Sequence, residues 1–301
     1  MLVSFGLDRL HPEWQDSVVC IGTFDGVHLG HAEVISQAIS MARTRELPCI
    51  LVTFDRHPAA TLAPERCPPA IQGLEANLRE FERLGVAVSV VLAFDERLSQ
   101  TTAQEFLDEI LGSRLRARHV VIGYDFALGK GREGNPEWLQ RHIDTTVVPA
   151  FNLDGHRVSS STIRKAVADG SLDIANRLLG RPFAIEGTVV AGQKLGRQLG
   201  FPTVNIARAS NTVLPPDGVY RGTCETRLGT FKAAASIGVR PAVGGTARTI
   251  EAFLLDYPGD EIYGSAVRLN LLERLREERS FPSLDALKDQ MALDVALVAA
   301  R

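Results

Sequence analysis

The chain reads Gly22-Thr-Phe-Asp-Gly-Val-His-Leu-Gly-His31 directly after the apolar run Ser17–Ile21, and a helical pattern begins within this segment at about Gly30. Because His28 and His31 are three residues apart, their imidazoles lie on one face of the starting helix, where unpaired backbone N–H groups favour a phosphate. Two positioned imidazole donors stabilise the charge that develops on an α-phosphate under attack. The segment therefore predicts an ATP-phosphate site in which His28 and His31 assist transfer of a nucleotidyl group.

Short apolar runs and amphipathic helical patterns alternate around this segment. The helix from Gly30 to Arg45 leads to the apolar run Cys49–Phe54, so strand, helix and strand form a βαβ unit. The pattern repeats as a helix with Leu74, Leu78, Phe81 and Leu84 on one face, a strand Val86–Phe94, a helix Thr102–Leu115, and strands His119–Tyr124 and Thr145–Phe151. Continuous apolar strands separated by helices indicate an α/β fold, a Rossmann-like parallel sheet covered on both faces. Ligands of such sheets collect at the carboxyl ends of the strands, where Gly22–His31 is placed.

The sequence pattern no longer alternates between strands and helices after a predicted helix Ser161–Leu179 and the break Gly180-Arg181-Pro182. We therefore expect one domain over residues 1–180 and a second over residues 181–301. The second half contains β-rich runs joined by Gly and Pro turns, namely Ala184–Ala191, Thr203–Ile206, Gly218–Arg227, Phe231–Ile237, Ile250–Asp256 and Ala266–Glu273. These runs predict an antiparallel β-barrel. A terminal helix from Ser283 to about Leu297 is expected to pack on the barrel through one face formed by Leu284, Leu287, Met291 and Val295.

The composition of the 301 residues, 45% hydrophobic and 23% charged, is that of a globular protein. A formal charge of −3 provides no field that would hold nucleic acid or an anionic membrane, so the expected partners are small-molecule substrates. The cysteines form no CxxC pair, which favours reduced thiols in the cytoplasm over a metal site or disulfides. No basic stretch with a long apolar core begins the chain, and no apolar run approaches the roughly 20 residues of a membrane span. Self-association is left open.

The Gly22–His31 segment resembles the HxGH signature of nucleotidyltransferases and class I aminoacyl-tRNA synthetases. Such a histidine pair also occurs in structural or exposed helices, but its place after the first strand favours a site. A second piece is Ser159-Ser-Ser-Thr-Ile-Arg164, whose hydroxyls can cap a helix and whose arginine follows one turn later. It suits the β- and γ-phosphates or the leaving pyrophosphate, although an ordinary Ser N-cap has the same pattern. A synthetase is disfavoured, because the chain is short and lacks a second lysine-rich signature and a basic surface for tRNA.

Motifs along almost the whole chain carry a more specific resemblance. They are Gly22–His31, Thr53-Phe-Asp-Arg-His-Pro58, Ile122-Gly-Tyr-Asp-Phe126, Ser159–Arg164, Gly196-Arg-Gln-Leu-Gly-Phe-Pro-Thr-Val-Asn205 and Leu275-Arg-Glu-Glu-Arg-Ser-Phe281. In this order they resemble the bacterial bifunctional riboflavin kinase/FMN adenylyltransferase family, also called FAD synthetase. The resemblance implies that ATP phosphorylates riboflavin to FMN, and that a second ATP adenylylates FMN to give FAD and pyrophosphate.

The resemblance also implies roles for residues of the first domain. His28, His31 and Arg164 would be the catalytic residues of adenylyl transfer. The residues that contact ATP and FMN would be Gly22, Phe24, Asp25, Gly30, Phe54, His57, Asp125, Phe126, Ser159 and Ser160. Plain core positions are the alternative interpretation for Phe54 and Phe126.

In the second domain, the resemblance implies that Thr203 and Asn205 bind Mg²⁺ through side-chain oxygens, which suit this hard ion. Glu251 would be the general base that accepts the proton of the riboflavin 5′-hydroxyl. ATP and flavin would contact Gly192, Lys194, Gly196, Arg197, Pro202, Arg276 and Phe281, with Glu278 nearby. Simpler interpretations stay open: a surface turn for the glycine-rich loop, a solvent-facing Asn205, a strand-end Glu251 and a solvated charge run around Arg276.

The chain departs from the family pattern at a few positions. Ala127 stands where Arg is common, Arg56 where Pro is usual, and Ser161 and Ala242 where Thr is usual. The missing cation at Ala127 predicts weaker contact with the FMN phosphate, unless Lys130 or Arg132 supplies one from nearby. Two alternatives to a bifunctional enzyme follow: an adenylyltransferase whose kinase half only binds flavin, and a noncatalytic flavin-binding protein on the same scaffold.

Overall fold

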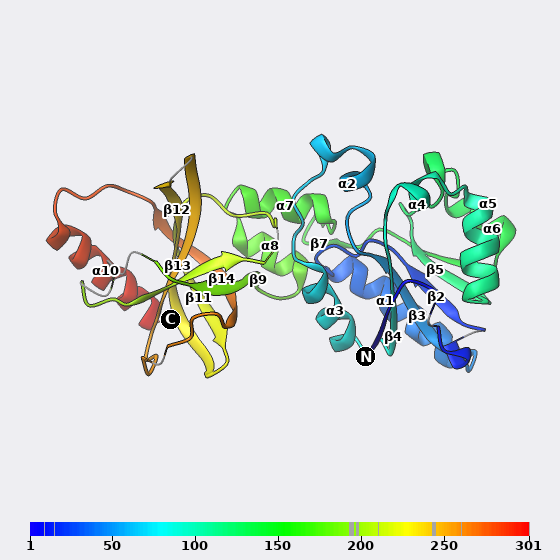
Figure 1. The fold of residues 1–301 in the computed structure, drawn as a ribbon, viewed down its shortest axis with the longest axis horizontal. Coiled ribbons are helices and arrows are strands. Elements are labelled where there is room, and N and C mark those ends of the chain that lie inside the picture. The colour runs from blue at the N-terminus through cyan, green and yellow to red at the C-terminus, as the bar shows by residue number, and fades with distance from the viewer. Residues whose placement is uncertain are drawn as a thin grey trace. The chain divides into compact units, whose positions relative to one another are not determined.

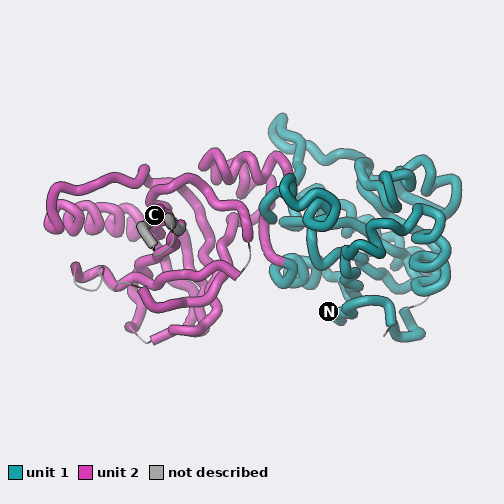
Figure 2. Tube along the Cα trace, turned by 45° about the horizontal axis from the view of Figure 1, so that its top comes forward, with its two compact units in different colours: residues 1–70, 74–160 teal, residues 71–73, 161–301 magenta. Residues whose placement is uncertain are grey.

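The computed structural model of the chain describes residues 1–8, 10–14, 16–192, 196, 199–209, 211–242, 245–259 and 261–300, without the side chains of residues 240–242 and 245–247. The chain divides into two compact units, which are coloured separately in Figure 2. Unit 1 comprises residues 1–70 and 74–160, and unit 2 comprises residues 71–73 and 161–301. The division falls at the start of helix α7 (Ser160–Ala168), whereas the boundary expected from the sequence lies between residues 180 and 181.

Unit 1 is built on a six-stranded sheet in which every pair of neighbouring strands is parallel. The spatial order is β1 (Leu2–Phe5), β4 (Val88–Leu92), β3 (Cys49–Phe54), β2 (Val18–Ile21), β5 (His119–Gly123) and β6 (Thr145–Val148) (Figure 1). The strand order reverses at β2, which has β3 on one side and β5 on the other. Loops that follow the strands at such a point form a crevice for ligands. The predicted parallel α/β architecture is confirmed, and the Gly22–His31 segment follows its central strand.

Helices cover both faces of this sheet. They are α5 (Ala103–Glu105), η3 (Phe106–Arg114) and α6 (Pro136–His142) on one face, and α1 (Leu29–Thr44) and α3 (Leu74–Arg83) on the other. Val19 and Ile21 of β2 pack into the first apolar core, whereas Val18 and Cys20 pack into the second. Each fully buried aliphatic side chain contributes about 1.5–3 kcal/mol. The central strand β2 is apolar throughout, and β3 beside it is apolar except at Thr53, because both of their faces are buried.

Short elements complete unit 1. They are η1 (Pro12–Trp14), α2 (Ala59–Leu62), η2 (Pro64–Arg66), α4 (Glu96–Gln100), η4 (Lys130–Arg132), and the hairpin strands β7 (Asn152–Leu153) and β8 (His156–Arg157). Neither this hairpin nor β1 and α6 was predicted, because such short elements contain too few residues for a periodic pattern.

Two predicted helices differ from the structure. The helix expected over Thr102–Leu115 begins as α5 with a Thr102–Glu105 capping box and continues as the π-helix η3. The helix expected over Ser161–Leu179 is divided into α7 and α8 (Leu172–Leu179). Gly170 lies between them with a φ of 79°, and this left-handed conformation ends α7.

Unit 2 contains a closed six-stranded barrel. Its strands are β9 (Phe183–Val190), β10 (Thr203–Arg208), β11 (Gly218–Thr226), β12 (Gly229–Ala242), β13 (Gly245–Leu254) and β14 (Ala266–Glu277), in the spatial order β10-β13-β12-β11-β14-β9 (Figure 1). All of its strand pairs are antiparallel, which confirms the prediction. Neighbouring strands approach so closely at Gly187 that a Cβ there would lie 2.1 Å from the Ala207 carbonyl oxygen, so only glycine fits.

The terminal helix α10 (Leu284–Ala299) begins at Ser283, whose hydroxyl accepts a hydrogen bond from the Ala286 N–H at 3.1 Å. It packs against β12 and β11, as expected. The predicted contact face is wrong at Leu284, which is 59% exposed; the side chains that face the barrel are partly buried at Leu287 and become fully buried only at Asp294 and Val298. Among the described residues, the helices are all too short or too polar to span a membrane.

Candidate active sites

The segment between β2 and α1 has a backbone conformation that is unfavourable for most residues other than glycine. Phe24, Gly26 and Val27 have φ angles of 47°, 83° and 38°, all in the left-handed region. This region is costly for Phe and more so for a β-branched Val, by about 1–3 kcal/mol for each residue. Such strain persists only where the surrounding structure holds the backbone in place.

Polar side chains from other elements hold this loop. Thr53 Oγ1, at the end of β3, donates to the Thr23 carbonyl oxygen at 3.3 Å, and Ser160 Oγ donates to the Asp25 carbonyl oxygen at 2.9 Å. The Gly26 N–H donates to Asn77 Oδ1 of α3 at 3.2 Å. Residues that lie far away in the sequence therefore support the loop in this conformation.

His28 is the N-cap of α1, and its Nδ1 accepts a hydrogen bond from the His31 N–H at 3.2 Å. A backbone N–H only donates, so Nδ1 of His28 carries no proton and the proton of the neutral ring is on Nε2. His28 is 5% exposed, and its ring stacks on that of His31 with centroids 3.5 Å apart. Phe24 packs edge-on against His31, with centroids 5.3 Å apart. The two imidazoles are therefore fixed together, and Nε2 is the donor of the neutral His28 ring.

The segment Val158–Ser160 lies next to the N-terminus of α1. A Cβ at Gly30 would lie 3.5 Å from the Val158 carbonyl oxygen, so the two chain segments approach closely here. Ser159 and Ser160 are partly buried, and the Ser160 hydroxyl holds the loop at Asp25 as described above. The structure thus brings Ser159 and Ser160, the first residues of the second motif, beside the Gly22–His31 segment. Arg164 follows in α7, within unit 2.

Aromatic and polar residues follow β3, one of the strands beside β2. Phe54 is partly buried against the apolar core and packs edge-on against Phe94, with centroids 5.4 Å apart. His57 Nδ1 accepts a hydrogen bond from the Ala59 N–H at 3.1 Å. Burial disfavours the ionised form of Asp55, but hydrogen bonds from the Arg56 side chain and the Phe94 N–H outweigh it and lower the pKa of Asp55. Arg56, where the family usually has Pro, thus pairs with its neighbour at 2.7 Å.

The residues after β5 follow the other strand that pairs with β2. Phe126 is partly buried against the apolar core, whereas Asp125 is exposed. Arg132 donates to the Asp125 carbonyl oxygen at 2.9 Å, and Arg157 of the β7–β8 hairpin lies 3.6 Å from the Asp125 carboxylate. Cations therefore lie near the position where Ala127 lacks one.

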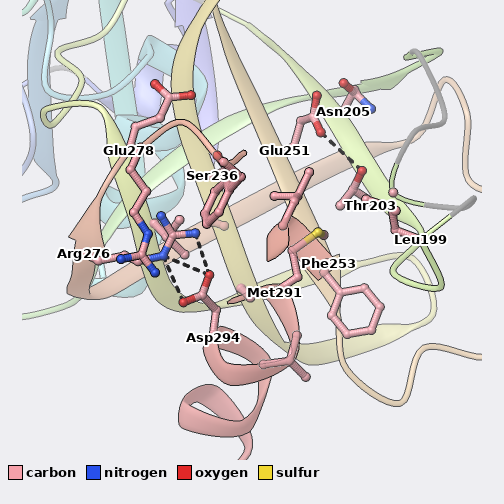
Figure 3. Close-up of a pocket in the computed structure, with 18 residues that line it drawn as sticks. Leu199, Thr203, Asn205, Ser236, Glu251, Phe253, Arg276, Glu278, Met291 and Asp294 are labelled. Atoms are coloured by element: carbon pink, nitrogen blue, oxygen red, sulfur yellow. Dashed lines mark hydrogen bonds and ion pairs between the residues drawn. The ribbon is translucent and has the colours of Figure 1, made fainter. Parts of the chain in front are cut away.

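In unit 2, the register of the barrel strands places polar side chains in one row. Asn205 of β10 lies opposite Glu251 of β13, and Glu251 lies opposite Ser236 of β12. Thr203 precedes Asn205 by two residues, so it lies on the same face of the sheet. Its hydroxyl donates to Glu251 Oε2 at 3.4 Å, and Figure 3 shows these side chains together.

A cavity of about 300 Å³ opens onto this row. Apolar side chains of α10 form one wall, and polar side chains of β10, β12, β13 and the end of β14 form the others. The lining includes Thr203, Asn205, Ser236, Glu251, Phe253, Arg276, Glu278, Phe281, Leu287, Met291, Asp294 and Val295. A cavity with an apolar wall and a few convergent polar groups is typical of a site for a small organic ligand.

Glycines pack tightly around the oxygens expected to bind a metal. A Cβ at Gly192 would lie 2.2 Å from Asn205 Nδ2, and one at Gly196 would lie 3.3 Å from Thr203 Oγ1. Within the described residues, no group of three or more His, Cys, Asp or Glu side chains could hold a metal. Magnesium needs few protein ligands when phosphate oxygens complete its coordination, so the hydroxyl of Thr203 and the amide oxygen of Asn205 fit this ion.

Arg276 at the end of β14 is fixed by α10. Its guanidinium donates from Nε to Oδ1 of Asp294 at 3.0 Å and from Nη2 to Oδ2 at 2.7 Å (Figure 3). The Asp294 side chain is 6% exposed, and Gln290 Nε2 also donates to its Oδ1, at 2.8 Å. The guanidinium lies 5.7 Å from the centroid of the Phe281 ring. This two-point pairing sets the orientation of Arg276 in the cavity wall.

Comparisons with known proteins agree with this division into two sites. The family model described as FAD synthetase matches residues 10–162, and the model described as riboflavin kinase matches residues 179–301. The bifunctional riboflavin kinase/FMN adenylyltransferase of Escherichia coli (strain K12) is 38% identical over 286 residues, which are 92% of this chain and 90% of that protein. The chain belongs to the bifunctional riboflavin kinase/FMN adenylyltransferase family.

Further relatives of this riboflavin kinase/FMN adenylyltransferase family member include the protein of the same name from Pseudomonas fluorescens. It is 38% identical over 297 residues, 97% of this chain and 94% of that protein. A crystal structure named as a macrolide-efflux protein from Streptococcus pneumoniae is similar with a TM-score of 0.90 and 31% identity, and it covers 99% of both chains. The whole chain therefore has the fold of a known structure.

In this riboflavin kinase/FMN adenylyltransferase family member, the structure gathers most of the expected site residues into two clusters. The residues from Gly22 to His31 cluster with Ser159 and Ser160. The expected site residues that come at the ends of β3 and β5 follow the two strands that neighbour β2 in the sheet. Pro202 lies directly before β10. Lys194 and Arg197 lie outside the described residues, as does the side chain of Ala242.

Sequence reasoning missed several residues of these clusters in the family member. Asn77 contacts the strained loop, Ser236 continues the row of Glu251, and Asp294 binds Arg276. The two polar residues Asn77 and Asp294 interrupt apolar helix faces and are 8% and 4% exposed. A polar residue at a buried helix position is the signal that would have pointed to them.

Proposed function

We propose that this chain makes FAD in two steps, with riboflavin phosphorylated by the domain over residues 181–301 and FMN adenylylated by the domain over residues 1–180. The observation that carries the proposal is that two family models match successive parts of one chain. Each part contains its own cluster of polar side chains, around His28 in unit 1 and around Glu251 in unit 2. A single-activity enzyme is not favoured, because Thr203, Asn205 and Glu251 are all present and lie together.

In the adenylylation step, an oxygen of the FMN phosphate attacks the α-phosphorus of ATP. A P–O bond forms, the bond to the β-phosphate breaks, and pyrophosphate leaves. His28 would donate from Nε2 to the α-phosphate oxygens, and His31, whose ring is stacked on that of His28, would assist in stabilising the charge that develops there. We assign Ser159, Ser160 and Arg164 to the remaining phosphates. Phe54, His57, Asp125 and Phe126, at the ends of the strands beside β2, would line the FMN and nucleotide pocket.

In the phosphorylation step, Glu251 accepts the proton of the riboflavin 5′-hydroxyl as its oxygen attacks the γ-phosphorus of ATP and ADP leaves. The hydrogen bond from Thr203 orients the Glu251 carboxylate. Thr203 and Asn205 would hold Mg²⁺, which would neutralise charge on the ATP phosphates when bound. The apolar wall of α10 and the Phe281 ring would contact the flavin.

We further propose that the enzyme acts in the cytoplasm on small-molecule substrates and without nucleic-acid or membrane partners. All four cysteines are free. Burial raises the pKa of the Cys49 thiol to about 12, and the pKa of the Cys20 thiol lies well above its usual range for the same reason. Unreactive thiols without disulfides are usual in a reducing compartment.

A flavin time course tests the proposal. The purified chain is incubated with riboflavin, ATP and Mg²⁺, and the flavins are separated by chromatography; FMN is expected first and FAD later. His28→Ala is expected to stop the sequence at FMN. Glu251→Ala is expected to leave riboflavin unchanged while still converting added FMN into FAD. Formation of neither product, or flavin binding that both substitutions leave intact without any turnover in the native chain, would contradict it.

A further inference from the structure

Helix α3 supplies a buried polar contact to the loop that carries the histidines. Asn77 is 8% exposed, and its Oδ1 accepts the Gly26 N–H at 3.2 Å. We propose that Asn77 is a positioning residue for adenylyl transfer, which acts by holding the backbone before His28. The inference rests on the proposed function of unit 1, and neither the sequence motifs nor the family resemblance assigns Asn77 a role.

This hydrogen bond lies at a point of the loop where its loss would affect the position of His28. Gly26 lies between Phe24 and Val27, which have unfavourable left-handed φ angles, and Val27 directly precedes His28. Without the acceptor on Asn77, the Gly26 N–H loses a partner in a buried position, and the loop loses a contact that opposes relaxation of this strain. A relaxed loop would move the start of α1, and therefore the Nε2 donor of His28.

A second contact from α3 reaches the same loop. Phe81 follows Asn77 by four residues, so both side chains lie on one face of the helix. The Phe81 ring packs edge-on against Phe24, with centroids 5.8 Å apart, and Phe24 packs against His31. One helix face therefore supports the backbone of the loop through Asn77 and an imidazole through Phe81. Because both contacts support the same loop, Asn77 is part of a set of supporting side chains and is not an isolated buried amide.

The test compares Asn77→Leu, which removes the acceptor but keeps a branched side chain with the same number of heavy atoms, with Asn77→Asp, which keeps an acceptor oxygen at the same place. FAD formation from FMN and FMN formation from riboflavin are measured on the same full-length preparation. The kinase activity reports on the folding of unit 2, and the melting temperature reports on the folding of the whole chain, so a loss confined to FAD formation at a native melting temperature is not unfolding. Amide hydrogen exchange of the segment 22–28 gives a readout that does not depend on turnover.

A matched control is available in unit 2. Asn176 of α8 accepts the Phe183 N–H through Oδ1 at 2.6 Å, so Asn176→Leu removes the same type of contact elsewhere. If loss of a buried amide acted only through stability, both leucine variants would lower FAD formation in proportion to their loss of thermal stability.

We expect Asn77→Leu to lower kcat for FAD formation by about tenfold to a hundredfold, with little change in KM for FMN or in kinase activity. Exchange in the segment 22–28 is expected to be faster in Asn77→Leu and native-like in Asn77→Asp. Native rates and exchange in Asn77→Leu, fast exchange in Asn77→Asp, or an equal loss in Asn176→Leu would overturn the inference. Absence of FAD formation by the native chain would instead overturn the proposed function, and the exchange comparison would still test the contact.

Discussion

His28 combines a structural and a chemical role, and the two are separable by substitution. Its Nδ1 caps α1 by accepting the His31 N–H, and its Nε2 carries the proton expected to contact the α-phosphate. His28→Asn keeps an acceptor at the N-cap, where Asn is a strongly preferred residue, but it removes the Nε2 donor. His28→Ala removes both. The asparagine variant is therefore expected to be stable and inactive.

The magnitudes follow from these contacts. Loss of one donor to a developing oxyanion lowers kcat by about 10²–10³, which is about 2.7–4 kcal/mol, so both variants are expected to lose FAD formation to this extent. Loss of the cap costs about 1 kcal/mol, which lowers the melting temperature of a unit of this size by about 2–4 °C in His28→Ala alone.

The assay is FAD formation from FMN, ATP and Mg²⁺, with kcat and KM determined separately, together with thermal unfolding of each variant. An interaction made mainly in the transition state changes kcat and leaves KM almost unchanged. Retention of kcat within about tenfold of the native value in His28→Asn would refute the donor role. Equal loss of melting temperature in the Asn and Ala variants would refute the capping role.

Further predictions concern the barrel and the acid stability of unit 1. Glu251→Gln is expected to slow riboflavin phosphorylation by about 10²–10⁴ while FAD formation from added FMN continues; a native kinase rate would exclude Glu251 as the base. Gly192→Ala places a Cβ 2.2 Å from Asn205 Nδ2, so kinase activity is expected to require about tenfold more Mg²⁺, as measured by a metal titration. Asp55 has a lowered pKa beside Arg56, so its ionised form stabilises the fold above pH of about 4, and this contribution is lost as the pH falls below that value. The difference in melting temperature between the native chain and Asp55→Asn should therefore be largest near neutrality and shrink below pH of about 4; a constant difference would contradict the assignment.

The fold was predictable wherever its signals were local. The run Cys49–Phe54 is apolar except at Thr53 because both faces of its strand are buried, and the structure has β3 over the same residues. The boundary between α7 and α8 was missed because the apolar pattern continues across Gly170, and only the left-handed φ of that residue shows that the chain turns. The short strand β1 was missed since Leu2 and Phe5 are exposed at 59% and 70%, so no buried face is visible in its sequence.

The candidate sites were predictable where the motif is contiguous, and less so where contacts cross the fold. His28 and His31 are close in the sequence, so their shared helix face follows from spacing alone. Asn77 is 51 residues from its partner Gly26, and Asp294 is 18 residues from Arg276. Nothing local in the sequence specifies such pairs, because they depend on how helices pack against loops and barrel strands.

The pairing of β10 with β13 limits where residues can be inserted into or deleted from unit 2. Asn205 and Glu251 share a face only because the two strands keep their present register. Deletion or insertion of a single residue within either strand would turn one of these side chains to the opposite face and separate the proposed proton acceptor from the proposed metal ligands. Length variation is therefore compatible with the chemistry in the turns between strands and not in the strands themselves. Insertions could be tested at each position across unit 2. The positions that tolerate no insertion would map the site.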